Sequence, residues 1–515
     1  MKDICTKYFF GLNKKKFEQQ IIHRLLDKDQ KMMTVTRDMT KIATEYHEKL
    51  QTAPEMTEER KEAIQKMLNI TDKTLIEDQK EMLEANTTQG EIEDAISIVS
   101  NGTTPGIDGI PYKSWKSLET EEEEKTEPNI PKMLHLLFND IEKRGLQSQQ
   151  TGERRVKEFM DGVMYLLYYK KKDKRMIENY RPITLLNTDY KLYTKTIAIK
   201  LGIVAPTLLS KDQAGFIPRR NLYDHTKMTH VVAKYCKLVG YNGCIVALDQ
   251  EKAYDKIDHE YMWQIMEKNG FPKTFIDRIK EMYKDTSKSV NGMLPRQFKV
   301  KRGVHQGNPM SCLLYNFTIE PLAESLRKST LKGIKIKGMA RKLLVTLFAD
   351  DTLVYLREDN DFEELKRILS QFCMASTTKF NLGKTEYLPI GSENFRRQVI
   401  ATRKVGDNVI EEGITIIKDG KPMQMLGAWV GNHANVTQQW DWIIKKQERV
   451  IKTWESNHLS YQGKELILKA IMSSISNNSK WNAKICRRKD SENVQGLPMG
   501  QKEKGANDME TSCST

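Results

Sequence analysis

Alternating apolar and polar stretches divide the chain into short strands, turns and amphipathic helices. The run LLVTLFADDTLVYL, residues 343–356, places seven mainly apolar residues before Asp350 and five after Asp351. Both runs are too short for a helix to be the first expectation, and they are rich in Leu, Val, Phe and Tyr. The pattern predicts a strand, a turn and a strand, with two carboxylates at the tip of a hairpin.

An aspartate pair in such a turn has two interpretations. Asp is a common turn former, and taken alone the pair indicates no more than a solvated turn. A second apolar run, CIVALDQEKAYDKID at 244–258, also reaches a carboxylate, Asp249, directly after a predicted strand. Two buried strands that each stop at an aspartate indicate carboxylates converging at one edge of a sheet.

Helical periodicity predominates near the amino terminus. Residues 1 to about 85 are predicted to form charged amphipathic helices, most clearly over 14–29 and 55–69. Further helices are predicted over 89–99, from a cap at Asp258 to Gly270, and from about Ser311. Two more amphipathic helices are predicted within 440–476, and the polar segment after 478 is predicted to be disordered.

Two further hairpins frame polar loops. In GVMYLLYYKKKDKRMIENYRPITLLN, residues 162–187, two apolar strands flank a turn that contains Lys170, Lys171 and Lys172. This turn is either a basic surface feature or a site for a polyphosphate, whose charges Lys and Arg neutralise. A second hairpin around Asn291-Gly292 leads into a G-x-x-Q-G loop at 303–307, and a short strand is predicted at MQMLGAWVG, 423–431.

Composition adds constraints on partner and compartment. The chain of 515 residues is 39% hydrophobic, and 83 basic against 69 acidic residues give a net charge of +14, which favours a polyanionic partner. Its seven cysteines include no C-x-x-C pair, which argues against zinc sites and disulfide frameworks and fits a reducing compartment. No apolar run approaches a membrane span and no secretory signal is present. We expect an intracellular protein, in the nucleus or cytoplasm, with no membrane partner.

The order of these motifs resembles a known family. TPGIDGIPYKSW, ENYRPITLLN, QAGFIPRR, DQEKAYDKIDH, RGVHQGNPMSCLLYNF and FADD look like successive motifs of the reverse transcriptase of non-LTR (LINE-type) retrotransposons. The resemblance covers roughly residues 90–475, and the motifs are specific jointly rather than singly. It implies RNA-directed DNA polymerisation, with an RNA template, a DNA primer and deoxynucleoside triphosphates as partners.

The resemblance also assigns roles in the chemistry. It implies two Mg²⁺ ions, for which Mn²⁺ can substitute, held by Asp249, Asp350 and Asp351. Such ions activate a primer hydroxyl and neutralise the leaving pyrophosphate, and Mg²⁺ prefers carboxylate oxygens. Asp255 lies outside the register of the metal ligands and is expected to make structural hydrogen bonds.

The remaining roles concern substrates. Tyr254 is expected to lie under the sugar and exclude ribonucleotides, or simply to pack in the core, and Lys384 to protonate pyrophosphate unless it is just exposed. Lys171, with Lys170 or Lys172 as alternatives, and Arg181 are expected to grip the triphosphate. The resemblance implies that Gln306 and Gly307 line the nucleotide pocket, and that primer and template contact Arg219, Arg220, Met425, Leu426 and Gly427. The last three residues resemble the primer-grip hairpin of the family.

The implied fold is α+β, a right-hand polymerase with fingers, an antiparallel-sheet palm and a truncated helical thumb. The chain shows neither an endonuclease domain before residue 90 nor a cysteine-rich or nuclease segment after the thumb, so we expect a fragment of a larger element protein. The alternative is a catalytically silent nucleic-acid-binding remnant. The expected divisions are a helical lead-in at 1–88, fingers at 89–235, palm at 236–432, partial thumb at 433–477 and tail at 478–515.

Overall fold

The protein combines helices and sheets, as the α+β prediction requires. The chain divides into two compact units, one comprising Gln19–Lys418 and the other Met1–Glu18 with Asp419–Thr515. The computed structural model describes residues 22–117, 129–145, 159–160, 162–168, 172–283, 287–290, 293–339, 341–426 and 428–433, with short pieces between 441 and 467.

A five-stranded sheet forms the centre of the larger unit. Its middle strand, β5 (Gly243–Leu248), lies between β9 (Asp351–Arg357) and β10 (Glu386–Ile390), and the edges are β8 (Val345–Phe348) and β13 (Thr415–Ile416). Neighbouring strands are antiparallel except for β10 and β13. The apolar runs that predicted β5, β8 and β9 are almost entirely buried, as expected for a sheet covered on both faces.

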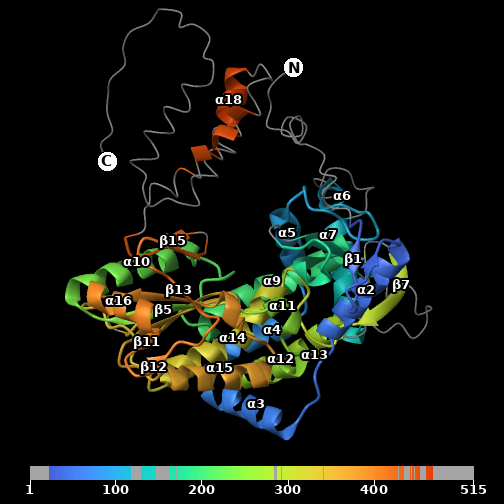
Figure 1. Cartoon of the computed structure of the whole chain (residues 1–515). Helices are drawn as coiled ribbons and strands as arrows, with labels where there is room; N and C mark the ends of the chain where they lie inside the picture. Colours follow the sequence, from blue (N-terminus) through green and yellow to red (C-terminus); the bar gives the residue numbers. More distant parts are fainter. Residues whose placement is uncertain are drawn as a thin grey trace, which may run out of the picture. The chain divides into compact units, whose positions relative to one another are not determined.

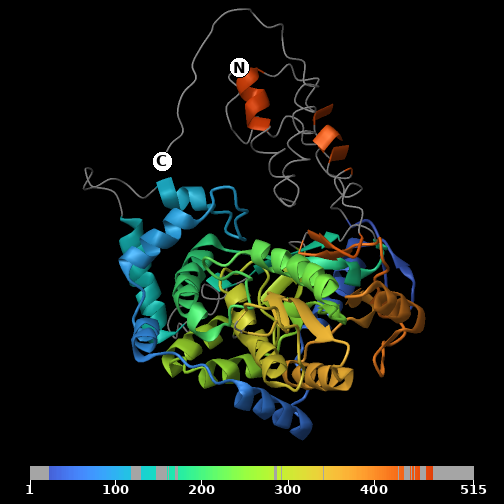
Figure 2. The ribbon, with the colours of Figure 1, turned by 90° about the vertical axis from the view of Figure 1, so that its left-hand side faces the viewer.

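Helices cover the two faces of this sheet (Figures 1 and 2). α10 (Leu222–Val239) lies on one side, and α15 (Phe362–Ser376) and α3 (Glu58–Ile70) lie on the other. α14 (Ser311–Lys328) is the most enclosed of these helices, since 15 of its 18 residues are buried. Its apolar side chains join the strands and the other helices in one large hydrophobic core.

A second sheet has four strands. Its order is β4 (Tyr180–Leu186), β3 (Gly162–Tyr168), β6 (Ser287–Val290) and β7 (Met293–Lys299). Alternate residues of β3 are buried against α2 (Thr36–Leu50), where Met164 and Leu166 join a small separate core. The predicted hairpins are thus present, although the turn 291–292 lies outside the described residues and β6 and β7 extend the sheet of β3 and β4.

The amino-terminal region differs from the expectation of continuous helix. The predicted helix over 14–29 is wrong in its described part, because β1 (Leu25–Leu26) pairs with β2 (Met32–Met33) around a turn. The short polar sequence DKDQK, residues 27–31, between the two apolar pairs permits this turn, and the Asp27 carboxylate accepts hydrogen bonds from the amides of Asp29 and Lys31. The helix predicted over 55–69 is confirmed as α3.

The helix boundaries follow capping chemistry. Thr88 and Glu91 form a capping box at the start of α5 (Gln89–Ile98), and the Asp258 carboxylate caps α12 (His259–Lys268). The other helical elements and short strands of this unit are α4 (Glu77–Glu84), α6 (Tyr112–Ser117), α7 (Ile130–Arg144), η2 (Ile177–Asn179), α9 (Thr188–Leu208), α11 (Ala253–Lys256), α13 (Lys273–Tyr283), η3 (Leu382–Lys384), α16 (Glu393–Thr402), β11 (Lys404–Val405) and β12 (Asn408–Val409).

The smaller unit contains a short hairpin and a helix in its described part. β14 (Met423–Met425) pairs with β15 (Ala428–Val430). The segment 423–431 is therefore a hairpin, as the family resemblance implies, and not the single strand that its apolar pattern predicts. Leu426 adopts a left-handed backbone conformation, with φ of 49°, where the chain reverses. α18 (Tyr461–Ile467) falls within the predicted helical segment 440–476, most of which, like the tail after 478, lies outside the described residues.

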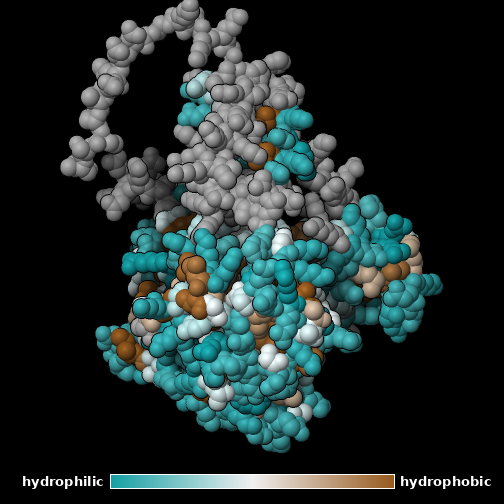
Figure 3. All heavy atoms as spheres, turned by 60° about the vertical axis from the view of Figure 1, so that its left-hand side comes forward, coloured by the Kyte–Doolittle hydropathy of each residue, from teal (hydrophilic) through white to brown (hydrophobic). Residues whose placement is uncertain are grey.

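Polar side chains predominate on the face of the molecule that Figure 3 draws. Apolar side chains on this face form small separate groups, which is normal for a protein surface in water. Among the described helices, none combines the length and apolar character needed to cross a lipid bilayer.

One buried ion pair ties α3 to the rest of the larger unit. The Arg60 guanidinium lies 2.6 Å from the Asp258 carboxylate, and both side chains are almost inaccessible. Replacing Arg60 with Met leaves the buried Asp258 charge unpaired, so we expect the free energy of unfolding to fall by about 3 kcal/mol. Chemical denaturation of this variant measures the loss. Lys61→Met, which removes an exposed pair with Glu58, should cost less than about 1 kcal/mol, and equal losses would contradict the assignment.

Candidate active site

Asp249 follows the last residue of β5 and lies against the segment after α15. Its backbone carbonyl accepts a hydrogen bond from the amide of Asn381 at 2.8 Å. Its carboxylate oxygen Oδ2 lies 2.9 Å from Nζ of Lys384. The pairing brings together two residues that the sequence predicted for the same reaction, and it fixes Lys384 at the end of β5.

Asp350 and Asp351 lie in the turn between β8 and β9. Register pairs Phe348 with Asp351, and Leu248 of β5 with Thr352 of β9. Asp249 directly follows Leu248, and Asp351 directly precedes Thr352. Because Leu248 and Thr352 are paired on neighbouring antiparallel strands, the two aspartates lie at the same end of the sheet. The predicted convergence of carboxylates at one sheet edge is what this register produces.

The three carboxylates influence one another electrostatically. Burial, and then repulsion by Asp249, raises the pKa of Asp350, while the nearby Arg181 guanidinium acts in the opposite direction. Nearby protein atoms exclude water from part of the Asp351 carboxylate, and this loss of solvation raises its pKa to about 6, with a further contribution from the charges of Asp350 and Asp249. The residue as a whole is nevertheless exposed. Like charges are held close here, as in sites that bind cations.

Arg181 and the G-x-x-Q-G loop lie together. The amide of Thr184, three residues after Arg181 on β4, donates to the carbonyl of Gln306 at 2.9 Å. Gly307 has φ of 116°, and a Cβ atom at this position would lie 2.4 Å from the Thr184 carbonyl oxygen. Only glycine tolerates both the conformation and the close approach, which explains the glycine after Gln306.

The buried Asp255 carboxylate fixes the orientation of the Gln306 side chain. Its Nε2 donates to Oδ2 of the buried Asp255 at 3.1 Å, and the Nε2 of Gln51 donates to Oδ1 of Asp255 at 3.5 Å. The structural hydrogen bonding predicted for Asp255 is confirmed. The contribution of Gln51 was missed, because its partner is 204 residues away and no local pattern reveals the contact.

Tyr254 lies on α11, between Asp249 and the G-x-x-Q-G loop in sequence. Its ring stacks on Tyr315 of α14 with centroids 4.7 Å apart, and its carbonyl accepts from the Val304 amide at 2.7 Å. Burial raises the pKa of the Tyr254 hydroxyl far above its usual value, so the ring stays neutral. Core packing and a sugar-facing role are compatible with this position.

Several other predicted residues are not gathered at this site. Lys171, its alternative Lys170, and Gly427 lie outside the described residues, and Met425 and Leu426 belong to the smaller unit. Arg219 is exposed. The half-buried Arg220 donates to the backbone carbonyls of Leu209, Ser210 and Gln213, which makes it a structural residue of its loop and leaves its predicted phosphate contact without support.

The donor chemistry of the three aspartates fits a hard divalent cation. Carboxylate oxygens are the ligands Mg²⁺ favours, and a cation would relieve the repulsion that contributes to the raised pKa values of Asp350 and Asp351. Within the described part of the chain, however, no three His, Cys, Asp or Glu side chains are already arranged around one metal position. The Lys384 ammonium, at Oδ2 of Asp249, would compete with a cation for this carboxylate.

Comparison with known proteins identifies the fold family. Residues 169–430 match the family described as reverse transcriptase (RNA-dependent DNA polymerase). The chain belongs to this family. The match spans the Arg181 strand, all three aspartates and the G-x-x-Q-G loop of this reverse transcriptase domain.

Relatives of this reverse transcriptase domain come from transposable elements. The chain is 27% identical over 396 residues to the Transposon TX1 uncharacterized 149 kDa protein of Xenopus laevis, covering 76% of the chain and 28% of that protein. It is 25% identical over 181 residues (35% and 16%) to the retrovirus-related Pol polyprotein from type-2 retrotransposable element R2DM of Drosophila melanogaster. It is 28% identical over 188 residues to the retrovirus-related Pol polyprotein from type-1 retrotransposable element R2 of Popillia japonica, covering 36% of the chain and 25% of that protein.

The predicted resemblance to a non-LTR reverse transcriptase domain is confirmed by these matches. In each of the three alignments the chain spans less than a third of the relative's length.

The electrostatics of Asp351 have a measurable consequence. Its pKa in the folded protein, about 6, exceeds the value of about 4 in an unfolded chain. The ionised form is therefore disfavoured by folding, and stability is lost as the pH rises through 6. Without divalent cations at pH 8, we expect Asp351→Asn to raise the free energy of unfolding by about 1 kcal/mol, because solvent screening reduces the full effect.

The measurement is the unfolding midpoint of both proteins between pH 4 and pH 8. The difference should be small at pH 4 and grow up to about pH 7. Asp407→Asn, in the exposed turn between β11 and β12, controls for the loss of a surface carboxylate. A difference that does not change with pH would show that Asp351 is not destabilised by its surroundings.

Proposed function

We propose that this domain polymerises DNA on an RNA template, as the reverse transcriptase of a non-LTR retrotransposon. The observation that carries the proposal is the gathering of Asp249, Asp350 and Asp351 at one end of the five-stranded sheet, beside Arg181. Membership of the reverse transcriptase family and relatives from retrotransposable elements support it.

In this proposal the elements take the parts of a right-hand polymerase. The five-stranded sheet with α12, α14 and α15 acts as the palm, and the sheet of β3 and β4 with the helices around it acts as the fingers. The hairpin of β14 and β15 serves as the primer grip, through Met425, Leu426 and Gly427, and the segment 433–477 begins the thumb. The region 1–88 leads into the polymerase.

The three aspartates would hold two Mg²⁺ ions, with Mn²⁺ as a substitute, which would supply charge neutralisation at the primer hydroxyl and at the leaving pyrophosphate. Asp249, Asp350 and Asp351 would together supply the carboxylate oxygens that hold these ions. The raised pKa values of Asp350 and Asp351 support this role, because a bound cation stabilises the ionised carboxylates.

Substrate residues surround the carboxylates. Arg181 and Lys171 grip the triphosphate, and the guanidinium of Arg181 is already close enough to Asp350 to affect its pKa. Gln306 and Gly307 line the nucleotide pocket, with the Gln306 amide held by Asp255. Once Lys384 is released from Asp249, it protonates the pyrophosphate. Tyr254 lies under the sugar.

The RNA template and the DNA primer are proposed to bind the basic surface of the protein, including the exposed Arg219. The net charge of +14 supports a polyanionic partner. Use of deoxynucleoside triphosphates and an intracellular location, in nucleus or cytoplasm, follow from the same proposal.

A second candidate function is nucleic-acid binding without turnover. The ion pair between Lys384 and Asp249 favours it, since a lysine here competes with a cation for the carboxylate. The two candidates share the basic surface and differ only in chemistry, so a direct activity measurement separates them.

Primer extension on an RNA template with Mg²⁺ tests the proposed function. We expect the folded wild-type chain to extend the primer, and Asp350→Asn to lower the rate by roughly 10²–10³-fold, because it removes a carboxylate that holds the ions. Both proteins should bind the template equally well. Template binding without extension by wild type, with Mg²⁺ or Mn²⁺, would favour the silent remnant.

The sugar-facing role of Tyr254 gives a further prediction. Tyr254→Val removes the ring beside the expected sugar position, so we expect the preference for deoxynucleotides over ribonucleotides to fall by about 10–100-fold, which corresponds to roughly 1–3 kcal/mol. Competing single-nucleotide incorporation measures the ratio. Tyr254→Phe keeps the ring and its stacking on Tyr315 and should retain the preference. An unchanged ratio in Tyr254→Val would leave Tyr254 with a packing role alone.

A further inference from the structure

The turn that carries Asp350 and Asp351 has an uncommon backbone conformation. Ala349, directly before Asp350, has φ of 55°, in the left-handed region that residues with a Cβ atom rarely adopt. Ala349 is also buried, with 2% of its surface exposed. Such a conformation persists only where surrounding contacts hold it.

Gln213 supplies such a contact. Its Oε1 accepts hydrogen bonds from the amide of Ala349 at 3.0 Å and from the amide of Gly215 at 2.9 Å. The side chain is fully buried. Because two N–H groups converge on one atom, that atom must be the amide oxygen rather than the nitrogen. The Ala349 amide would otherwise be a buried donor without an acceptor, which is costly.

The segment around Gln213 is attached to β8 on both sides of this contact. The amide of Ala214 donates to the carbonyl of Leu347 at 2.9 Å, and the amide of Leu347 donates to the carbonyl of Asp212 at 2.7 Å. A Cβ atom on Gly215 would lie 2.4 Å from the Ala349 nitrogen. The segment therefore lies as close to the turn as backbone allows, which is why glycine follows Gln213 and Ala214.

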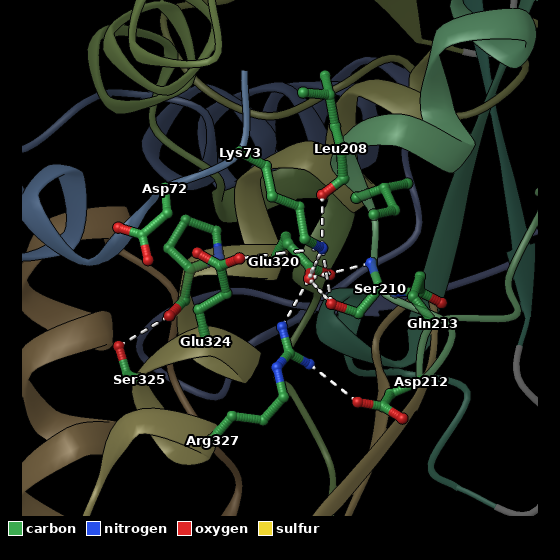
Figure 4. Close-up of polar contacts among 12 residues, drawn as sticks. Asp72, Lys73, Leu208, Ser210, Asp212, Gln213, Glu320, Glu324, Ser325 and Arg327 are labelled. Carbon is green, nitrogen blue, oxygen red and sulfur yellow. Dashed lines mark hydrogen bonds and ion pairs between the residues drawn. The ribbon is translucent and has the colours of Figure 1, made fainter. Parts of the chain in front are cut away.

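A network of hydrogen bonds and ion pairs connects the segment 210–213 to α14 (Figure 4). Oε1 of the buried Glu320, on α14, accepts from the Ser210 amide at 3.1 Å and from Arg327 at 2.7 Å. Arg327 also contacts the Asp212 carboxylate at 3.1 Å, and Lys73 lies 3.3 Å from Glu320. Residues 210–213 are thus fixed to α14, the most enclosed helix of the core.

We propose that Gln213 is a positioning residue for the catalytic turn. Resting on the proposed function, the inference is that Gln213 keeps Ala349 in its left-handed conformation, so that the Asp350 and Asp351 carboxylates remain directed toward the cation and the primer hydroxyl. Gln213 does not touch the substrate. Its acceptor oxygen acts through the backbone of the turn. Its Nε2 is buried and has no hydrogen-bond partner among the described residues, so this atom has no part in the proposed positioning.

Two substitutions separate the acceptor from mere volume. Gln213→Met keeps the length of the side chain and removes the acceptor, whereas Gln213→Glu keeps an oxygen at the position of Oε1. We expect Gln213→Met to lower kcat for primer extension by about 10–100-fold with KM for the nucleotide unchanged. Bound Mg²⁺ should raise the unfolding midpoint of the protein. The Mg²⁺ concentration at which half of this rise is reached should be about tenfold higher in Gln213→Met than in wild type. Gln213→Glu should return both values to within about threefold of wild type.

A third measurement does not depend on catalysis. Hydrogen exchange of the peptide containing 343–356 should be faster at the turn amides in Gln213→Met, and close to wild type in Gln213→Glu. Phe138→Ala, which removes a fully buried ring from α7, controls for general destabilisation and should change neither the exchange at the turn nor the Mg²⁺ response.

The outcomes are distinguishable. If Gln213→Met changes neither the turn exchange nor the Mg²⁺ response, or if Gln213→Glu behaves like Gln213→Met, the positioning role is wrong. If wild type does not extend a primer, the proposed function fails, and the exchange measurement still decides whether Gln213 holds the turn.

Discussion

The register between β5 and β9 is the constraint on which the rest of the site depends. Leu248 pairs with Thr352, so Asp249 and Asp351 reach the same end of the sheet. A slip of one residue would turn every side chain of one strand to the opposite face and separate the carboxylates. The register is secure because β5 is buried on both faces, and any slip would expose apolar side chains to water.

Holding three like charges together has a cost that the surrounding structure offsets. Burial and mutual repulsion disfavour the ionised forms of Asp350 and Asp351, and the left-handed Ala349 adds backbone strain. Against these stand the large hydrophobic core, the hydrogen bonds of Gln213 and the ion pair of Asp249 with Lys384. A rigid support lets the site keep an unfavourable arrangement that a cation can use.

The amino-terminal helices belong to this support. Arg60 of α3 pairs with Asp258, which caps the helix after Tyr254, and Gln51 beyond α2 contacts Asp255. The carbonyl of Gln51 also accepts from the amides of Lys301 and Arg302, just before the G-x-x-Q-G loop. The sequence of this region indicates only a charged lead-in, but the region is packed against the loops that frame the proposed nucleotide pocket.

The sequence by itself determined the local elements and the candidate chemistry, because apolar periodicity, capping residues and motifs such as ADD and G-x-x-Q-G act over a few residues. It predicted the hairpin of Asp350, the strand before Asp249, α3, α5 and α12. It did not reveal the β1–β2 turn, the Lys384 pairing or the support by Gln213 and Gln51. Only the tertiary structure decided these, because they depend on side chains and backbone groups more than a hundred residues apart, or on turns whose apolar segments are too short to show a period.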